Sequence, residues 1–402
     1  MDQRNRVIAL ACSWLLMFSA YSSVLCISPI LNLSALEFGL TAFQAGLLFS
    51  APVFTLALVA FMGGYLGDQI GPRKAAGLGA VVLALSALLR GISPSFAVFF
   101  LLNLLVGIGW GLIFPNLPKI VKMWFSDKVL GTATGIYSTG VFAGGTLALA
   151  ISMPVVFPLM GNWRGVCLFW GVISVVIAVI WWFLAKEPTR SVVESSIPSQ
   201  APRASFSTVV KNKHIWVVAI FFGLAANMTF YIVTGWFPAF FLEKGLSEAA
   251  SGLLTSLVTV AAIPAVFLVP FASDRLGLRR PFLWISCVVA AMAFFVIIFA
   301  PFVLDIVCMI ALGATLTATY VMCLFLPLEL MPSKQTGTAS GIVISVGYVG
   351  GAFGPQIAGA LKDLTGSLVP SIVLLVLLMV ISAGLAFLIP ETGWRRKPPR
   401  LS

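Results

Sequence analysis

Charged side chains inside long apolar runs are the residues of this sequence whose types and positions could do chemistry. Arg90 closes one apolar run, Lys119 and Lys122 lie in the next, and Glu329 lies near the end of a later one. A charge in hydrocarbon costs about 2.5–3.5 kcal/mol on insertion scales, so each is a candidate for binding or proton transfer. For Arg90 and Lys122 the alternative is that the long side chain reaches a polar membrane interface. Because three of the four are basic, the pattern favours an anion over a cation.

Glu329 is the one acidic residue that we expect to be able to carry a proton. No Asp or Glu lies in the middle of the first, fourth, fifth or seventh apolar run. The alternative for Glu329 is an ion pair with Lys334 or with another base at the same membrane face. The sequence leaves both interpretations open.

Tyrosine and asparagine side chains add polar groups to the same runs. A buried tyrosine needs a partner for its hydroxyl, which water or a substrate in a cavity can supply. Asn227 and Tyr231 are four residues apart and therefore share a helix face. For each tyrosine the alternative is packing or an interfacial position.

The elements that must position these residues follow from the composition. Of the 402 residues, 60% are hydrophobic and 9% are charged, and the mean hydropathy is +1.07. Soluble domains carry about 25% charged residues, so a soluble enzyme is excluded, and so is a disordered chain. A chain in lipid satisfies its backbone polar groups as helices or as a closed barrel. Barrel strands have about 10 residues of alternating character, whereas these runs are longer and continuous, which predicts an all-α membrane protein.

Twelve apolar runs approach or exceed the roughly 20 residues that a spanning helix needs. A polar stretch separates the first six from the last six, and its segment 191–207 is rich in Ser and Pro, which predicts a flexible tether. We therefore expect an N-terminal bundle at 1–186, a cytoplasmic linker at 187–213 and a C-terminal bundle at 214–402. The predicted spans are Val7–Pro29, Thr41–Gly64, Ala75–Ile92, Ala97–Val121, Gly131–Val156, Val166–Ala185, Ile215–Phe241, Ala249–Phe271, Pro281–Pro301, Phe302–Leu326, Thr336–Leu361 and Val369–Ile389.

Positive charge reports the orientation of these spans. If both termini are cytoplasmic, all but four of the 24 Lys and Arg lie on the inner side, as the positive-inside rule requires. The basic charge is spread over short loops, which argues against nucleic-acid binding. The six cysteines lie in apolar runs without a CxxC pair, and His214 is the single histidine. We therefore expect no metal site and no cofactor.

The two halves of the chain repeat at a constant offset of 206 residues. The matched positions include Asp68 with Asp274, Arg73 with Arg279, and Gly131–Ile136 with Gly337–Ile342. A constant offset over several segments indicates two homologous six-helix bundles. Because each half has an even number of spans, the repeats are parallel and related by an axis along the membrane normal.

The duplicated loop after the second span of each half carries charge at fixed positions. The copies lie at Gly64–Lys74 and Ser273–Arg280. The acid can accept hydrogen bonds from a helix N-terminus, and the glycine permits a tight turn. We expect these groups to latch the two halves on the cytoplasmic side, and the alternative is an ordinary charged turn. The latch residues would be Asp68, Arg73, Lys74, Asp274, Arg279 and Arg280.

The duplicated loop resembles the G-x-L-x-D-x-x-G-x-R-K motif of the major facilitator superfamily, and the twelve spans, the linker and the closing Pro390–Thr392 fit that family. Pro115–Lys122, Trp163–Gly165 and Gly235–Pro238 are similar to blocks of the cyanate porter and 2-nitroimidazole transporter branch. The resemblance implies the major facilitator fold, two rocking bundles, and a central cavity faced by spans 1, 5, 7, 10 and 11. It favours Lys122 as a substrate contact. Asn103 stands where proton-driven drug exporters carry Arg, which counts against drug–proton antiport.

The sequence thus predicts a secondary active transporter, a symporter or antiporter and not an enzyme, for a small anion or weak acid such as cyanate, nitrite or a carboxylate. The alternative is an efflux transporter for neutral or amphiphilic compounds, including nitroimidazole-like ones. A sensor without transport activity is disfavoured, because the linker and tails are too short for a signalling domain. We expect a monomer in a bacterial inner membrane, with a small-molecule substrate and the lipid bilayer as its partners. The expected substrate-binding residues are Arg90, Lys122, Tyr21, Asn103, Tyr137, Asn227, Tyr231, Tyr320 and Tyr348.

Overall fold

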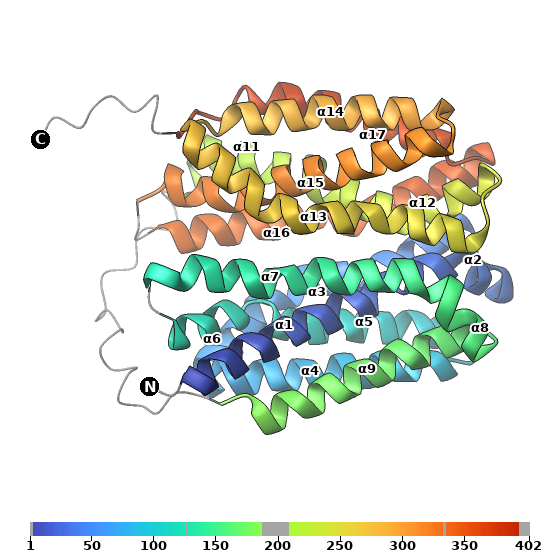
Figure 1. Cartoon of the computed structure of the whole chain (residues 1–402), viewed down its shortest axis with the longest axis horizontal. Coiled ribbons are helices and arrows are strands. Elements are labelled where there is room, and N and C mark those ends of the chain that lie inside the picture. Colours follow the sequence, from blue (N-terminus) through green and yellow to red (C-terminus); the bar gives the residue numbers. More distant parts are fainter. Residues whose placement is uncertain (1–2, 126, 187–208, 333–334, 394–402) are drawn as a thin grey trace, which may run out of the picture. The chain divides into compact units, whose positions relative to one another are not determined.

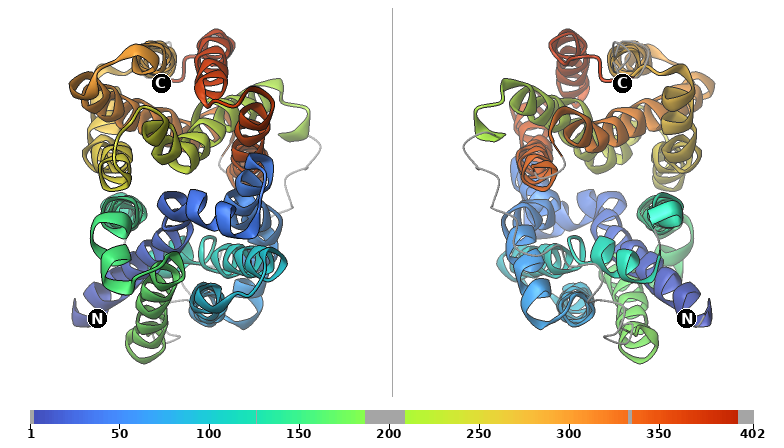
Figure 2. Two further views of the ribbon diagram at one scale, coloured as in Figure 1. Left: turned by 90° about the vertical axis from the view of Figure 1, so that its right-hand side faces the viewer. Right: turned by 90° about the vertical axis from the view of Figure 1, so that its left-hand side faces the viewer.

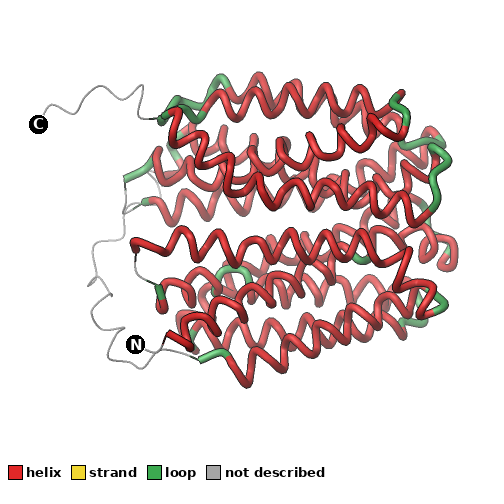
Figure 3. The backbone as a smooth tube through the Cα atoms, viewed as in Figure 1, coloured by secondary structure: helices red, strands yellow, loops and turns green. Residues whose placement is uncertain are grey.

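The computed structural model describes residues 3–125, 127–186, 209–332 and 335–393 (Figures 1 and 3), so the tether predicted at 191–207 lies outside the described residues. Within these ranges every regular element is a helix. Twelve helical segments are long and apolar enough to cross a membrane, which confirms the predicted all-α fold and its number of spans. They are Gln3–Phe38, Ala42–Ile70, Pro72–Ile92, Phe96–Trp124, Thr132–Met160, Trp163–Leu184, Lys213–Glu243, Glu248–Leu276, Arg280–Phe299, Phe302–Leu330, Thr338–Thr365 and Val369–Ala386.

The helices continue past the apolar runs until a residue stops them. Span 1 extends to Phe38 instead of ending at the predicted Pro29, and Gly39 (φ 63°) ends it in the left-handed conformation. Thr41 then starts α3 (Ala42–Ile70) through a capping box, in which its hydroxyl accepts from the Gln44 amide at 3.2 Å and the Gln44 side chain accepts from the Thr41 amide at 3.0 Å. Apolarity therefore predicts the spans, whereas caps set their ends.

The chain forms two compact units, of which the first comprises residues 1–199 and 234–256. In this unit α1 (Gln3–Leu25) packs against α7 (Asp127–Ile151) and α9 (Trp163–Leu184). Helix α4 (Pro72–Leu89) packs against α5 (Phe96–Ile113) and also against α9. Span 1 thus contacts spans 5 and 6, and span 3 contacts spans 4 and 6.

The second unit comprises residues 200–233 and 257–402. Here α11 (Lys213–Phe221) packs against α16 (Thr336–Thr365), while α14 (Arg280–Phe299) packs against α15 (Phe302–Leu330) and α17 (Val369–Ala386). These are spans 7 with 11, 9 with 10 and 9 with 12, the counterparts of the pairs 1 with 5, 3 with 4 and 3 with 6. The packing of each unit therefore follows the predicted repeat, and Figure 2 shows the helices of each unit end-on.

Span 1 is interrupted in its C-terminal half. Helix α1 ends at Leu25, and α2 (Ile27–Phe38) begins after a turn at Cys26. Pro29 has no N–H to donate to the Leu25 carbonyl four residues earlier, which accounts for the kink.

Other spans are interrupted by irregular helical turns. Span 4 consists of α5 and α6 (Leu117–Trp124), and the Asn116 amide between them donates to the carbonyls of Gly63 and Leu112, both at 2.8 Å. Span 7 consists of α11, a π-helical segment η4 (Phe222–Met228) and α12 (Thr229–Glu243). π-helical turns are rare and occur often at functional sites.

Small residues let some spans approach closely, and large apolar residues cover the outside. A Cβ on Gly107 of α5 would overlap the Pro52 carbonyl and the Thr55 hydroxyl of α3, so only glycine fits there. Phe61 is 84% exposed and Phe183 is 79% exposed. Such side chains suit a surface that faces lipid.

Candidate functional site

Arg90 is a completely buried cation of the first unit. It lies in the short 3₁₀ turn η1 (Arg90–Ile92) at the C-terminal end of span 3, and its side chain is 0% exposed. Its Nη1 donates to Asn103 Oδ1 at 3.0 Å, and its Nη2 donates to the Ser23 carbonyl at 2.7 Å. Its Nε has no hydrogen-bond partner among the residues that the structure describes. The guanidinium therefore points into the protein rather than to the membrane interface.

The groups around Arg90 are neutral and are held in place. The amide nitrogen of Asn103, in α5, donates to the Phe99 carbonyl at 2.8 Å, which directs the amide oxygen at the guanidinium. The Ser23 hydroxyl is hydrogen-bonded to the Ser174 hydroxyl of α9 at 2.9 Å. Within the described ranges no carboxylate pairs with Arg90. A buried charge without a counter-ion is costly, so this site favours an anion.

Arg164 of the same unit differs from Arg90, because it is paired with a carboxylate. It pairs with Glu37 of α2 at 2.6 Å, and the Trp163 indole donates to the same carboxylate at 2.6 Å. Its guanidinium lies 4.4 Å from the centre of the Trp163 ring and donates to the Ser93 carbonyl at 3.2 Å. The charge of Arg164 is thus matched locally, in contrast to that of Arg90.

Lys119 and Lys122 lie on the exposed side of α6, but their surroundings differ. Lys119 Nζ pairs with Asp68 at 2.5 Å and donates to the Gly64 carbonyl at 2.7 Å. Lys122 is exposed and forms no hydrogen bond or ion pair with the part of the chain that the structure describes. Lys119 therefore binds the C-terminal end of span 2, whereas Lys122 is the base of α6 that remains available to a ligand.

Four of the predicted site residues gather around span 7 of the second unit. Phe222, at the start of the π-helical segment, lies 5.4 Å from the Tyr320 ring and 6.4 Å from the Tyr348 ring. Asn227 lies in the same segment, and its amide donates to the Phe222 carbonyl at 3.3 Å. A Cβ on Gly351 of α16 would lie 2.6 Å from the Tyr231 ring and 3.4 Å from the Asn227 side chain. The glycine of α16 thus lets both residues pack closely.

Two predicted site residues of the first unit lie elsewhere. Tyr21 packs edge-on against Trp110, with ring centres 4.9 Å apart. Tyr137 is buried in α7, and the described contacts do not join it to Arg90. The binding residues predicted from the sequence therefore fall into the Arg90 group, the span 7 group and residues outside both groups.

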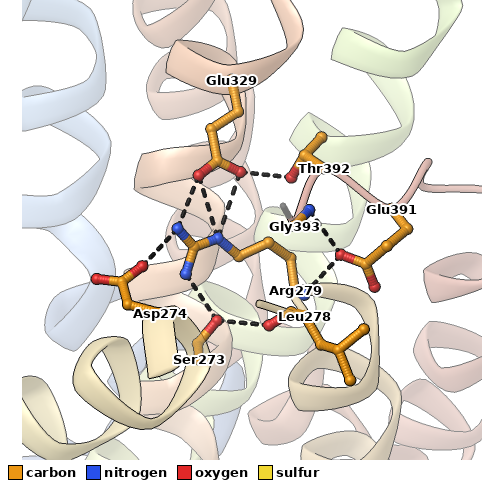
Figure 4. Close-up of polar contacts among 8 residues, drawn as sticks. All are labelled: Ser273, Asp274, Leu278, Arg279, Glu329, Glu391, Thr392 and Gly393. Atoms are coloured by element: carbon orange, nitrogen blue, oxygen red, sulfur yellow. Dashed lines mark hydrogen bonds and ion pairs between the residues drawn. The ribbon is translucent and has the colours of Figure 1, made fainter. Parts of the chain in front are cut away.

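The charged loop of the second unit centres on Arg279 (Figure 4). Its Nη2 pairs with Asp274 at 2.6 Å and with Glu329 at 2.8 Å, and its Nη1 donates to the Ser273 hydroxyl at 2.7 Å. Burial lowers the pKa of the Arg279 guanidinium, but the hydrogen bonds and charges of Glu329 and Asp274 outweigh burial and raise that pKa above its ordinary value. The arginine is therefore a permanently charged junction between the loop and α15.

The chain segment after α17 completes this network (Figure 4). Glu391 accepts from the backbone amides of Arg279 at 2.7 Å and Arg280 at 3.1 Å, and so caps the N-terminus of α14. The Thr392 hydroxyl donates to Glu329. The sequence identified the Pro390–Thr392 block but assigned it no role, because its partners lie over 60 residues away in the chain.

Glu329 is engaged by Arg279 and Thr392, which corresponds to the ion-pair interpretation rather than to an isolated carboxyl. Lys334, the partner considered from the sequence, lies outside the described residues. The role of Glu329 in proton coupling stays a prediction.

The corresponding loop of the first unit uses different partners. Arg73 donates to the carbonyls of Ala185 at 2.5 Å and Trp182 at 3.0 Å, at the end of α9. Asp68 pairs with Lys119 instead of with an arginine, and Lys74 is exposed. These contacts tie each loop to its own unit, and a latch between the two halves stays a prediction.

Residues 13–355 match the model of the Major Facilitator Superfamily. This match covers most of the chain, and the chain belongs to that family. It is 26% identical over 344 residues to the cyanate transport protein CynX of Escherichia coli K12, covering 85% of this chain and 86% of that protein. It is 25% identical over 371 residues to the 2-nitroimidazole transporter of the same organism, covering 90% of each chain. These similarities confirm the predicted branch.

The fold matches the crystal structure of a bacterial homolog of the human lysosomal transporter Spinster, in an inward-facing and occupied conformation. The TM-score is 0.84, with 16% identity, 99% of this chain and 100% of that chain covered. The family match and the twelve apolar spans together make the protein an integral membrane transporter, not an enzyme, and this similarity shows the same fold.

Proposed function

We propose that this transporter moves a small anion or weak acid across a bacterial inner membrane by secondary active transport. Two six-helix halves, 1–186 and 214–402, would alternate access to the substrate, with both termini in the cytoplasm and the monomer as the working unit. The named substrate of CynX, cyanate, is a small anion, which supports this class.

The observation that carries the proposal is the buried positive charge of Arg90. Its side chain is 0% exposed, and its acceptors, Asn103 and the Ser23 carbonyl, are neutral. A buried ion without a partner is far less favourable than a paired one. An anion that enters this region would form an ion pair with the Arg90 guanidinium, which no described carboxylate of the protein does.

Lys122 and the span 7 group would supply further contacts. Lys122 is exposed and without a partner among the described residues, so it can attract an anion from the inner side. Asn227 and the tyrosines of the span 7 group are the amide and hydroxyl groups that we propose as substrate contacts in the second unit. Sites rich in aromatic groups with few polar ones are typical of small-molecule binding.

Uptake into proteoliposomes tests the proposal. Labelled cyanate, nitrite, formate and acetate would be offered to the parent protein and to Arg90→Ala and Lys122→Ala. We expect uptake of at least one anion by the parent and a loss in both variants. Absence of uptake of all four anions would contradict the proposed substrate class, and intact uptake in both variants would contradict the assigned residues.

Efflux of a neutral or amphiphilic compound is the second candidate. It is supported by the rings of Phe222, Tyr320 and Tyr348, which form an aromatic group in the second unit, and by the similarity to the 2-nitroimidazole transporter. Expression in a drug-hypersensitive bacterial host would then raise the inhibitory concentration of 2-nitroimidazole. Unchanged inhibitory concentrations across a broad panel would exclude this candidate.

A further inference from the structure

The kink in span 1 lies directly beside Arg90. The Arg90 Nη2 donates to the Ser23 carbonyl at 2.7 Å, and the Cys26 thiol donates to the same carbonyl at 3.4 Å. Because Pro29 cannot donate to the Leu25 carbonyl, the helix is weakened within this turn. The hydrogen bond from the Arg90 guanidinium to the Ser23 carbonyl therefore helps to stabilise the kinked conformation of span 1.

Beyond the kink, α2 contacts residues 234–235 of α12, in the part of span 7 that belongs to the first unit. The Ser28 hydroxyl donates to the Thr234 carbonyl, and it also lies 3.3 Å from the Gly235 carbonyl. On another side of α12, a Cβ on Gly235 would lie 2.8 Å from the Phe49 ring of α3, so glycine lets α12 pack closely against α3 as well. Ser28 follows Ser23 by little more than one helical turn. A change of the kink angle therefore moves Ser28 relative to the carbonyls that it binds.

An anion at Arg90 would compete with the Ser23 carbonyl. The Nε of Arg90 has no partner among the described residues and offers the first hydrogen bond. Hydrogen bonds between two ionised groups are stronger than those to a neutral acceptor, so an anion draws the guanidinium away from Ser23. Asn103 cannot move with it freely, because its amide is bound to the Phe99 carbonyl.

The burial of Arg90 makes this binding depend on conformation. Because the side chain is 0% exposed, an anion reaches it only when the surrounding packing opens. A ligand that binds one conformation better than another shifts the population toward that conformation. Occupation of Arg90 and opening of the packing around span 1 are therefore linked.

We propose that Arg90 couples anion binding to the angle of span 1 and, through Ser28, to the contact between α2 and α12. The inference rests on the proposed transport of a small anion and adds a second role to the same side chain. Arg90 is both the contact of the anion and the clamp on the kink. Release of the Ser23 carbonyl lets α2 reorient, which changes the hydrogen bonds of Ser28.

Hydrogen–deuterium exchange of the full-length protein in nanodiscs tests this coupling. Backbone exchange in the peptide that covers Ser23–Leu31 would be measured with cyanate, nitrite, formate or acetate at constant ionic strength. We expect the transported anion to increase exchange in this peptide of the parent protein. In Arg90→Gln, exchange should be raised without anion and should not respond to it, whereas Arg164→Gln should respond like the parent.

Transport kinetics separate the coupling role from a purely structural one. Arg90→Lys keeps the charge but cannot hold both acceptors, so kcat should fall while KM changes little, whereas Arg90→Gln should raise KM. Ser28→Ala should alter kcat by about fivefold without changing KM, because it removes a hydrogen bond of α2 to α12. Ser34→Ala is the matched control, since among the described residues the hydroxyl of this buried serine of α2 bonds only to the Leu31 carbonyl of its own helix, at 3.0 Å.

Each result has a defined meaning. Transport without any anion-dependent exchange in span 1 would overturn the coupling and leave the proposed function intact. Equal kinetics of Ser28→Ala and Ser34→Ala would likewise overturn it. Failure of all four anions to be transported would overturn the proposed function and this inference with it.

Discussion

The guanidinium of Arg90 lies 3.0 Å from the side-chain oxygen of Asn103, so a fully buried cation is met by a neutral amide rather than by a carboxylate. Arg164 of the same unit, by contrast, is paired with Glu37 at 2.6 Å. The difference between the two arginines is the physical basis for the proposal of an anionic substrate. A substitution of Asn103 by Asp would therefore neutralise the Arg90 charge with a side chain of the same size.

Lys122→Ala should weaken substrate binding without destabilising the protein. Lys122 is exposed and has no partner among the described residues, so its removal breaks no described contact. We expect a rise in KM for anion uptake and an unchanged Tm. Lys119→Ala is the comparison, because it removes the pair with Asp68 and should lower the free energy of unfolding by up to about 1 kcal/mol. If KM rises equally in Lys122→Ala and Lys119→Ala, both lysines act through the general surface charge, and Lys122 is not a specific substrate contact.

Glu329→Gln should destabilise the loop of the second unit, and the pH profile of its uptake tests the predicted role of Glu329 in proton coupling. The carboxylate is bound by Arg279 and Thr392, and its neutralisation should lower the free energy of unfolding by about 1–2 kcal/mol. Pairing raises the pKa of the Arg279 guanidinium, so the stability that the pair with Glu329 contributes is fully present below the ordinary pKa of arginine. We therefore expect this stability to be constant from about pH 5 to 9. Thermal unfolding and uptake rates across that range would be compared with those of the parent and of Glu248→Gln. An unchanged Tm with a flat pH profile would instead make Glu329 the proton carrier.

Gly351→Ala should destabilise the second unit. An added Cβ would lie 2.6 Å from the Tyr231 ring and would push it away from α16. Overpacking of this kind costs about 1–3 kcal/mol, which a fall in Tm in detergent would show. Gly384→Ala in α17 is the control, since a Cβ there has nothing within 4 Å and should leave Tm unchanged or slightly higher. Equal Tm values for the two variants would mean that the span 7 group tolerates repacking.

The fold was predictable because it depends on two features that the sequence shows directly: the length of each apolar run and the repeat of the two halves. Each apolar run had to cross the bilayer as a helix, and the offset of 206 residues paired Asp68 with Asp274 and so defined two similar halves. The ends of the helices were less predictable. Span 1 continues to Phe38 because Gly39, not the loss of apolarity, stops it.

The site was predictable in its residue types but not in its partners. Arg90 and Asn103 were candidates from their charge and polarity, but the Ser23 carbonyl, 67 positions away, cannot be inferred from side-chain chemistry. From its nearness in sequence, Lys334 was the expected partner of Glu329, whereas in the structure Glu329 pairs with Arg279, which is 50 positions away. Partners that arise only when helices pack are therefore the part that the sequence could not supply.

The uptake rate of labelled cyanate by Asn103→Asp tests the central claim most directly. The substitution would place a carboxylate beside the Arg90 guanidinium and neutralise it while keeping the size of the side chain. We expect kcat/KM to fall by at least about tenfold with Tm little changed, because the new buried ion pair offsets the lost hydrogen bond from the Asn103 amide to the Phe99 carbonyl. Asn162→Asp is the matched control, since either residue caps α9 by accepting from the Gly165 amide. Uptake by Asn103→Asp equal to that of the parent and of Asn162→Asp would contradict the claim that the unpaired charge of Arg90 binds the anion.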